Sequence, residues 1–202
     1  MTDTINRIAR KIPVWAIWII YLLPVPWLLY LAMTGGLGRE PIEALEHELG
    51  EIAIQLLIIG LAITPLRRFL NINLLKFRRA IGLLAFTYVV LHVLVWAILD
   101  VQVVSQMWAD ILKRPYVTVG MAATLLMVPL AVTSNNASVR RLGAKWRSLH
   151  KLVYPAVLLA AIHFLWVRKG LQLEPILYMG VILFLILLRM RWISGRKPSA
   201  AG

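Results

Sequence analysis

The chain has no cysteine among its 202 residues and few charged residues of any kind. The missing cysteines exclude disulfide bonds, iron–sulfur clusters and thiolate sites, although they leave the cellular compartment open. Charged residues make up 15% of the chain, and only nine residues are acidic. The sequence holds no zinc motif, no nucleophile elbow and no buried pair of acids, so hydrolytic chemistry has no candidate residues.

Hydrophobic residues dominate instead, at 60% of the composition with a mean hydropathy of +0.78. Such a chain is far more apolar than a soluble domain. About 20 apolar residues in a helix cross the roughly 30 Å hydrocarbon core of a bilayer. Because the runs are continuous rather than alternating, they predict an all-α integral membrane bundle in one domain, residues 1–202. We count six transmembrane helices, at about 14–33, 50–66, 80–99, 116–133, 149–167 and 175–189.

The basic residues indicate how this bundle is oriented. The formal net charge is +13, and 17 of the 22 lysines and arginines precede the first run or lie in the second loop, the fourth loop and the tail. By the positive-inside rule, both termini are predicted to be cytoplasmic. Because the charge alternates between loops and does not gather in one patch, a nucleic-acid partner is not expected. The N-terminal "MTDTINRIARKI" starts like a signal peptide but lacks a clean cleavage site, so we interpret the first run as a retained helix.

The acidic residues gather on the opposite side. All of them except Asp3 fall there, and five lie within "REPIEALEHELGE". This outer acidic segment is either a docking surface for a protein partner or a solvated loop. His47 lies within it, and a surface histidine is favoured over a role at a quinone site or in a partner contact.

Two histidines are predicted to lie at similar depth in the outer half of the bundle. His92 is twelve residues beyond Ala80, and His163 is fourteen beyond Leu149, on two helices that both run outward. Neutral imidazole is a ligand of haem iron, and two imidazoles on facing helices can hold a flat macrocycle between them. We therefore predict that His92 and His163 bind one haem iron. The alternative is that each histidine only makes a hydrogen bond between helices.

His150 is harder to assign, because it lies near the cytoplasmic interface, about 20 Å along a helix from His163. No histidine faces it at the start of the third helix, where Arg78 and Arg79 stand instead. Arg78 precedes His92 by nearly four helical turns and could pair with a haem propionate or another anionic cofactor group. The alternatives are that the two arginines only anchor the topology and that His150 contacts lipid headgroups.

The spacing of the fifth helix raises a geometric objection. Thirteen residues leave His150 and His163 about 140° apart around a straight helix, so they would not share a face. Pro155 lies between them and can kink a helix in a membrane. A competing function is a proton-coupled transporter that uses the histidines as a relay. It is disfavoured because no acid lies deep within a span and no repeated halves are evident.

Several segments resemble one known family. They are "GGLGREP" with "EHELG" (35–50), "ITPLRR" (63–68), "RRAIGLL" followed by "LH" (78–92), "RPYVTVG" (114–120), "RLGAKWRSLHKLVY" (141–154) and "IHFLW" (162–166). Together they resemble the MsrQ family of haem-binding membrane subunits of bacterial methionine-sulfoxide reductase systems. That family falls within the ferric-reductase-like transmembrane group.

The resemblance implies a multi-pass b-type cytochrome of the bacterial inner membrane that also carries flavin mononucleotide. It implies electron transfer from the quinone pool or a cytosolic flavin reductase to a periplasmic molybdopterin-dependent methionine-sulfoxide reductase subunit. His92, His150 and His163 fall on the haem-ligand positions of the family, whereas no role is carried over for His47. The wider group has two histidine pairs and a flavin and nicotinamide domain. This sequence lacks the fourth bundle histidine and such a domain, so we expect one or two haems and an external electron donor.

Overall fold

The computed structural model describes residues 2–168 and 172–194, with side chains as far as Arg189. These residues are predominantly helical and include no strand, as the sequence predicts. The helices are α1 (Thr2–Lys11), α2 (Val14–Leu22), α3 (Pro24–Thr34), α4 (Pro41–Phe69), α5 (Arg78–Val95), α6 (Val104–Lys113), α7 (Pro115–Val132), α8 (Asn136–Leu142), α9 (Ala144–Leu149), α10 (Val153–Val167) and α11 (Leu173–Ser194). Short 3₁₀ turns lie at Leu75–Phe77 and His150–Leu152, and a π-helical segment at Trp96–Val101. The basic side chains of Arg191, Arg196 and Lys197, which helped to predict a cytoplasmic tail, lie outside the described part.

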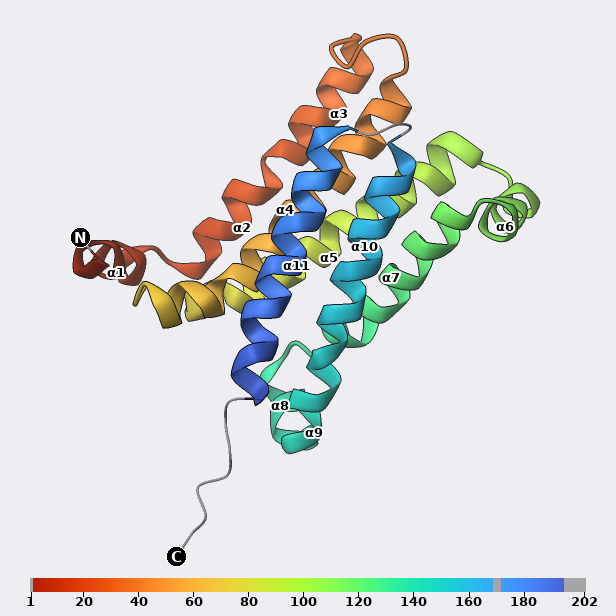
Figure 1. Cartoon of the computed structure of the whole chain (residues 1–202). Helices are drawn as coiled ribbons and strands as arrows, with labels where there is room; N and C mark the ends of the chain where they lie inside the picture. Colours follow the sequence, from red (N-terminus) through yellow and green to blue (C-terminus); the bar gives the residue numbers. More distant parts are fainter. Residues whose placement is uncertain (1, 169–171, 195–202) are drawn as a thin grey trace, which may run out of the picture.

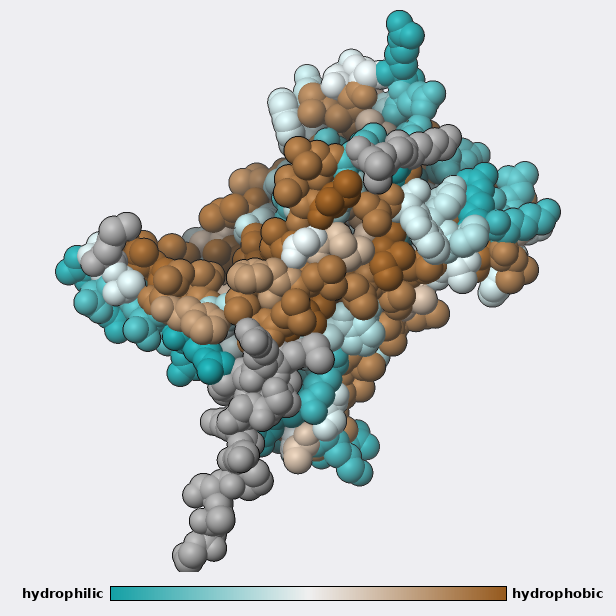
Figure 2. Space-filling view, in the orientation of Figure 1, coloured by the Kyte–Doolittle hydropathy of each residue, from teal (hydrophilic) through white to brown (hydrophobic). Residues whose placement is uncertain are grey.

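The long helices lie side by side and successive ones run in opposite directions (Figure 1). α1, α8 and α9 lie at one end of the bundle, which we call the inner end, and the α3–α4 connection and α6 lie at the other, the outer end. A hydrophobic band crosses the middle of the molecule, with hydrophilic residues at both ends (Figure 2). Five helical stretches are long and apolar enough to span a membrane: Val14–Thr34, Pro41–Phe69, Leu75–Val101, Pro115–Val132 and Ala144–Val167. The chain is therefore a helical membrane protein, while α11 as a sixth span and the side of the termini remain predictions.

The first expected span is interrupted in its middle. Pro24 has no N–H group to donate to the carbonyl of Ile20, and the helix restarts there as α3. α2 has no buried residue, so this span lies at the edge of the bundle. The Tyr88 hydroxyl on α5 donates a hydrogen bond to the carbonyl of Tyr21, which attaches α2 to the core.

α4 is longer than the predicted span, because it begins at Pro41 rather than near residue 50. Proline is well suited to the first position of a helix, where an N–H group would have no partner. The added turns place Glu46 and Gly50 in regular helix. α4 packs along α5, α7 packs along α10, and α11 lies against both α4 and α10. The side chains that are completely buried between these helices include Leu56, Ile63, Leu84, Ala85, Tyr88, Ala156, Val157 and Ile182.

The outer end contains a helix that the sequence analysis did not predict. After His92 the chain widens into the π-helical segment, turns at Gln102 with φ +61°, and enters α6. α6 exposes Val104, Trp108 and Leu112, which recur every four residues and form one apolar stripe. This helix leads directly to Arg114 and α7.

The fifth span is interrupted before its proline. The break is the 3₁₀ turn at His150–Leu152, between α9 and α10. Pro155 lies in the first turn of α10, where the missing N–H group has little consequence. His150 is therefore part of a turn and does not continue the helix that carries His163.

Candidate functional site

A cavity of about 400 Å³ lies between α4, α5, α7 and α10. Its outer end is polar and is lined by Glu43, Glu46, His47, Asp100 and Arg114. Its deeper part is apolar and is lined by residues such as Ala53, Ile54, Leu57, Ala123 and Met127. His92 and His163 both line it. The volume is in the range of cofactor and small-molecule sites in proteins.

His92 is held against the outer part of α4. Its Nδ1 atom lies 2.9 Å from the backbone carbonyl oxygen of Glu46. The ring lies over Gly50, where a Cβ atom would come within 3.2 Å of Nδ1. Glycine at this position therefore allows the imidazole to reach the carbonyl one helical turn earlier.

His163 is held against α7 in the same way. Its Nδ1 atom lies 2.7 Å from the carbonyl oxygen of Tyr116. The ring lies over Gly120, and a Cβ atom there would come within 2.8 Å of Nδ1, too close to be accommodated without movement. In both cases the acceptor carbonyl precedes the glycine by four residues, so the two sites share one local design.

These contacts define which nitrogen of each ring is available. A carbonyl oxygen can only accept, so Nδ1 carries the hydrogen and Nε2 keeps its lone pair. Histidine ligands of metals commonly donate their other N–H group to a backbone carbonyl in this manner. Each ring therefore presents Nε2 as a potential metal ligand.

The two rings are also correctly spaced for one metal ion between them. Their centroids are 6.1 Å apart and their planes are inclined at 79°. An ion bound to both Nε2 atoms at about 2 Å would separate the ring centres by about 6 Å. The residues present therefore fit a haem iron, which His92 and His163 would hold.

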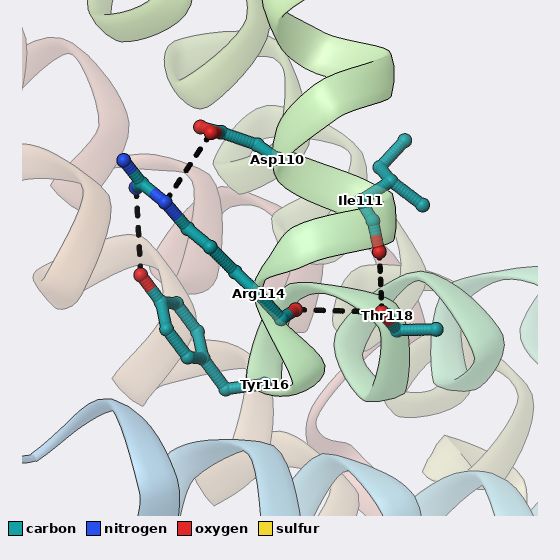
Figure 3. A network of polar contacts seen from close by, with 5 residues as sticks. All are labelled: Asp110, Ile111, Arg114, Tyr116 and Thr118. Atoms are coloured by element: carbon teal, nitrogen blue, oxygen red, sulfur yellow. Dashed lines mark hydrogen bonds and ion pairs between the residues drawn. The ribbon is translucent and has the colours of Figure 1, made fainter.

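A small polar network stands beside this cavity (Figure 3). Arg114 Nε lies 3.2 Å from Asp110 Oδ1, and Arg114 Nη1 donates to the Tyr116 hydroxyl at 3.4 Å. The Thr118 hydroxyl contacts the carbonyls of Ile111 and Arg114. The hydrogen bond to Tyr116, with help from the charge of Asp110, raises the pKa of Arg114. The network joins α6 to the first turn of α7, whose Tyr116 carbonyl holds His163.

His150 lies outside this cavity. Its Nε2 atom is 3.0 Å from the Thr133 hydroxyl, which itself donates to the carbonyl of Pro129. The hydroxyl therefore accepts from His150, and Nε2 carries the hydrogen. Trp146 stacks on the imidazole with centroids 3.9 Å apart, and its indole N–H donates to the Thr133 carbonyl. No second histidine faces His150 among the described residues.

Arg78 and Arg79 are exposed at the start of α5 and also lie outside the cavity. The structure thus brings His92 and His163 together and leaves His150, Arg78 and Arg79 at the inner end. His47 lies at the outer mouth of the cavity.

Several residues that form this site were not predicted from the sequence. Gly50 and Gly120 were quoted only within motifs and were given no role, although glycine in the middle of a helix costs about 1 kcal/mol relative to alanine and is therefore a signal. The Glu46 and Tyr116 carbonyls could not be found, because backbone acceptors have no sequence signature. Arg114 was quoted only as part of a motif.

Comparisons with known proteins identify the family of the chain. Residues 49–161 match the family described as ferric reductase like transmembrane component. A relative from Agrobacterium fabrum is 45% identical over 174 residues, which cover 86% of this chain and 81% of the relative. A relative from Brucella ovis is 43% identical over 191 residues, or 92% of this chain and 87% of the relative. Both are named protein-methionine-sulfoxide reductase heme-binding subunit MsrQ. The chain belongs to the MsrQ family. No solved structure matches it with significance.

Most of the cavity of this MsrQ-family chain lies within the segment that matches the ferric-reductase-like group. That segment contains Gly50, His92, Gly120 and His150, and it ends two residues before His163. The alignments to the two MsrQ relatives are longer and extend over most of the chain. Family membership and the cavity geometry therefore concern the same region of the chain.

Proposed function

We propose that this protein is the haem-binding membrane subunit of a methionine-sulfoxide reductase system and transfers electrons across the membrane. One observation carries the proposal. The ring centroids of His92 and His163 are 6.1 Å apart, and Nδ1 of each ring is hydrogen-bonded to a backbone carbonyl. The names of the MsrQ relatives support it, as do the five apolar helices.

A haem b between His92 and His163 would supply one-electron redox chemistry. The chain's own residues would hold it. The two imidazoles provide neutral ligands, and the Glu46 and Tyr116 carbonyls fix the orientation of their rings. The apolar residues in the deeper part of the cavity exclude water from the macrocycle. Arg114 is the one lysine or arginine among the described residues that line the cavity, and it stands at the polar end.

We further propose that the protein lies in the bacterial inner membrane with six spans, including α11, and with both termini in the cytoplasm. Electrons would enter at the inner end from the quinone pool or a cytosolic flavin reductase. They would leave at the outer end to a periplasmic molybdopterin-dependent reductase subunit that docks near the acidic segment. His150, Arg78 and Arg79 are proposed to serve a second cofactor at the inner end, either another haem or flavin mononucleotide.

The absorption spectrum of the purified protein tests this proposal. We expect a sharp reduced band of a six-coordinate b haem, with at least one haem per chain. In proteoliposomes, a reductant on the inner side should reduce that haem and, through it, an acceptor on the outer side. A colourless protein obtained with an adequate haem supply would contradict the proposal.

A further inference from the structure

α6, the short helix at the outer end, carries three large apolar side chains that the described part of the chain leaves exposed. Val104, Trp108 and Leu112 are 66%, 63% and 80% exposed. Because they are four residues apart, they follow one side of the helix. α6 packs against α7 and the π-helical segment, and its partly buried residues include Met107 and Ile111. The apolar stripe is therefore separate from the side that packs on the bundle.

The exposed surface of α6 has a second, hydrophilic side. Ser105, Gln106 and Lys113 are exposed there. Gln106 lies about 160° around the helix from Trp108. At the position of α6 in Figure 2, hydrophilic surface lies above and hydrophobic surface lies below. A helix with two such sides is suited to the interface between water and the hydrocarbon of a bilayer.

The neighbouring spans hold α6 close to the membrane surface. One apolar helical stretch ends at Val101, just before α6, and the next begins at Pro115, just after it. In Figure 1, α6 is seen nearly end-on, whereas α7 lies across the view. Figure 3 shows the same change of direction between Arg114 and Thr118. α6 therefore crosses the outer ends of two spans and does not continue either of them.

We propose that α6 lies in the membrane interface at the outer end of the bundle, with Val104, Trp108 and Leu112 inserted among the lipid chains. The stripe continues a lipid-facing surface, because Ile98 and Leu99 in the adjoining π-helical segment are exposed apolar residues as well. Tryptophan is enriched at membrane interfaces, where its ring is in an apolar region and its N–H group reaches water. This membrane contact requires neither the haem nor the proposed electron transfer.

The charges of α6 indicate which lipids it contacts. The helix contains one acid, Asp110, and one base, Lys113, so it has no net charge. Asp110 is already paired with Arg114, at 3.2 Å. Burial of the apolar stripe, and not attraction to anionic headgroups, therefore drives insertion. We expect the same insertion in phosphatidylcholine as in phosphatidylglycerol, and no weakening by salt.

Single labelled cysteines in the full-length, haem-loaded protein test this proposal. The natural sequence has no cysteine, so an introduced one carries the only label. Leu112→Cys and Val104→Cys probe the two ends of the stripe, and Gln106→Cys on the opposite side of the same helix is the matched control. Each variant carries a fluorophore and is placed in phosphatidylcholine nanodiscs. Quenching by brominated lipid chains is then compared with quenching by iodide in the water.

We expect brominated lipid to remove most of the emission from the labels at positions 104 and 112, and iodide to leave it in place. The label at position 106 should respond in the opposite way. Because all three positions are exposed, the substitutions leave the core intact.

The proposal is overturned if the labels at positions 104 and 112 are quenched by iodide as strongly as the label at position 106. The stripe would then face water, where a protein partner could cover it. Insertion that needs phosphatidylglycerol, or that is lost at high salt, would equally contradict the apolar contact. The haem band of the same samples reports separately on the proposed electron-transfer function.

Discussion

The outer and inner halves of the bundle use histidine in opposite ways. In the outer half, His92 and His163 donate from Nδ1 to backbone carbonyls, which leaves Nε2 with its lone pair. In the inner half, His150 donates from Nε2 to the Thr133 hydroxyl and is covered on one face by Trp146. The function of a membrane histidine therefore depends on which nitrogen its neighbours occupy, and not only on its depth.

The two halves also differ in what they leave unsatisfied. The outer cavity presents two neutral ligands and apolar walls, which suit a flat cofactor bound through its metal. The inner half instead buries Arg189, whose Nε atom has no hydrogen-bond partner among the described residues. The first half is arranged for coordination, whereas the second contains a buried positive charge.

Among the variants that test this difference between the two halves, removal of an outer histidine should have the largest effect. We expect His92→Ala and His163→Ala each to abolish the same haem signal, because one iron needs both imidazoles. His150→Ala should leave that signal in place and either remove a different one or shift its potential. Haem-to-protein stoichiometry with reduced-minus-oxidised spectra measures this. Loss of separate signals from His92→Ala and His163→Ala would show that the two histidines do not share an iron.

The glycines beneath the rings should give a smaller, graded effect. A Cβ atom at Gly120 would lie 2.8 Å from His163 Nδ1, and one at Gly50 would lie 3.2 Å from His92 Nδ1. Gly120→Ala should therefore displace its ring and lose a hydrogen bond worth about 1 kcal/mol, with Gly50→Ala less affected. Three measurements detect this displacement: the reduction potential, the haem content and electron paramagnetic resonance. The last reports the angle between the imidazole planes.

Gly82→Ala is the control for these variants, because no atom lies within 4 Å of a Cβ atom there. Alanine is a better helix former than glycine by about 1 kcal/mol, so this variant should be as stable as the wild type or more stable. Equal potentials in Gly120→Ala, Gly50→Ala and Gly82→Ala would show that the glycines do not position the ligands.

The sequence was sufficient to predict that His92 and His163 lie at the same depth, and the structure places their rings 6.1 Å apart, but their geometry could not be predicted. Counting residues from the start of each helix placed His92 and His163 at similar depth, because rise per residue is nearly constant in a helix. The identity of the free nitrogen depends on the Glu46 and Tyr116 carbonyls, which belong to other helices and have no residue-specific pattern.

The inner half was less predictable for a different reason. In a straight helix, His150 and His163 would point about 140° apart around the axis. Pro155 was the expected source of a kink. The break lies earlier, at His150–Leu152, where Trp146 and Thr133 hold the histidine through contacts between α9 and α7. Likewise α6 was missed because its apolar stripe covers only one face and does not form a continuous run.

The smallest effect is expected from the hydroxyl that holds His150. Thr133→Val removes both the contact with His150 and the bond from Thr133 to the Pro129 carbonyl. Thr87→Val is the matched control, because Thr87 makes the same bond to the carbonyl of Leu83, four residues earlier, and touches no histidine in the contacts described. The difference between the two variants isolates the His150 contact, worth about 1 kcal/mol or about 2–4 °C in the thermal midpoint. The outer haem band should be the same in both. If Thr133→Val shifts that band as much as Gly50→Ala does, the two halves are coupled. They would then form one continuous site and not two separate ones.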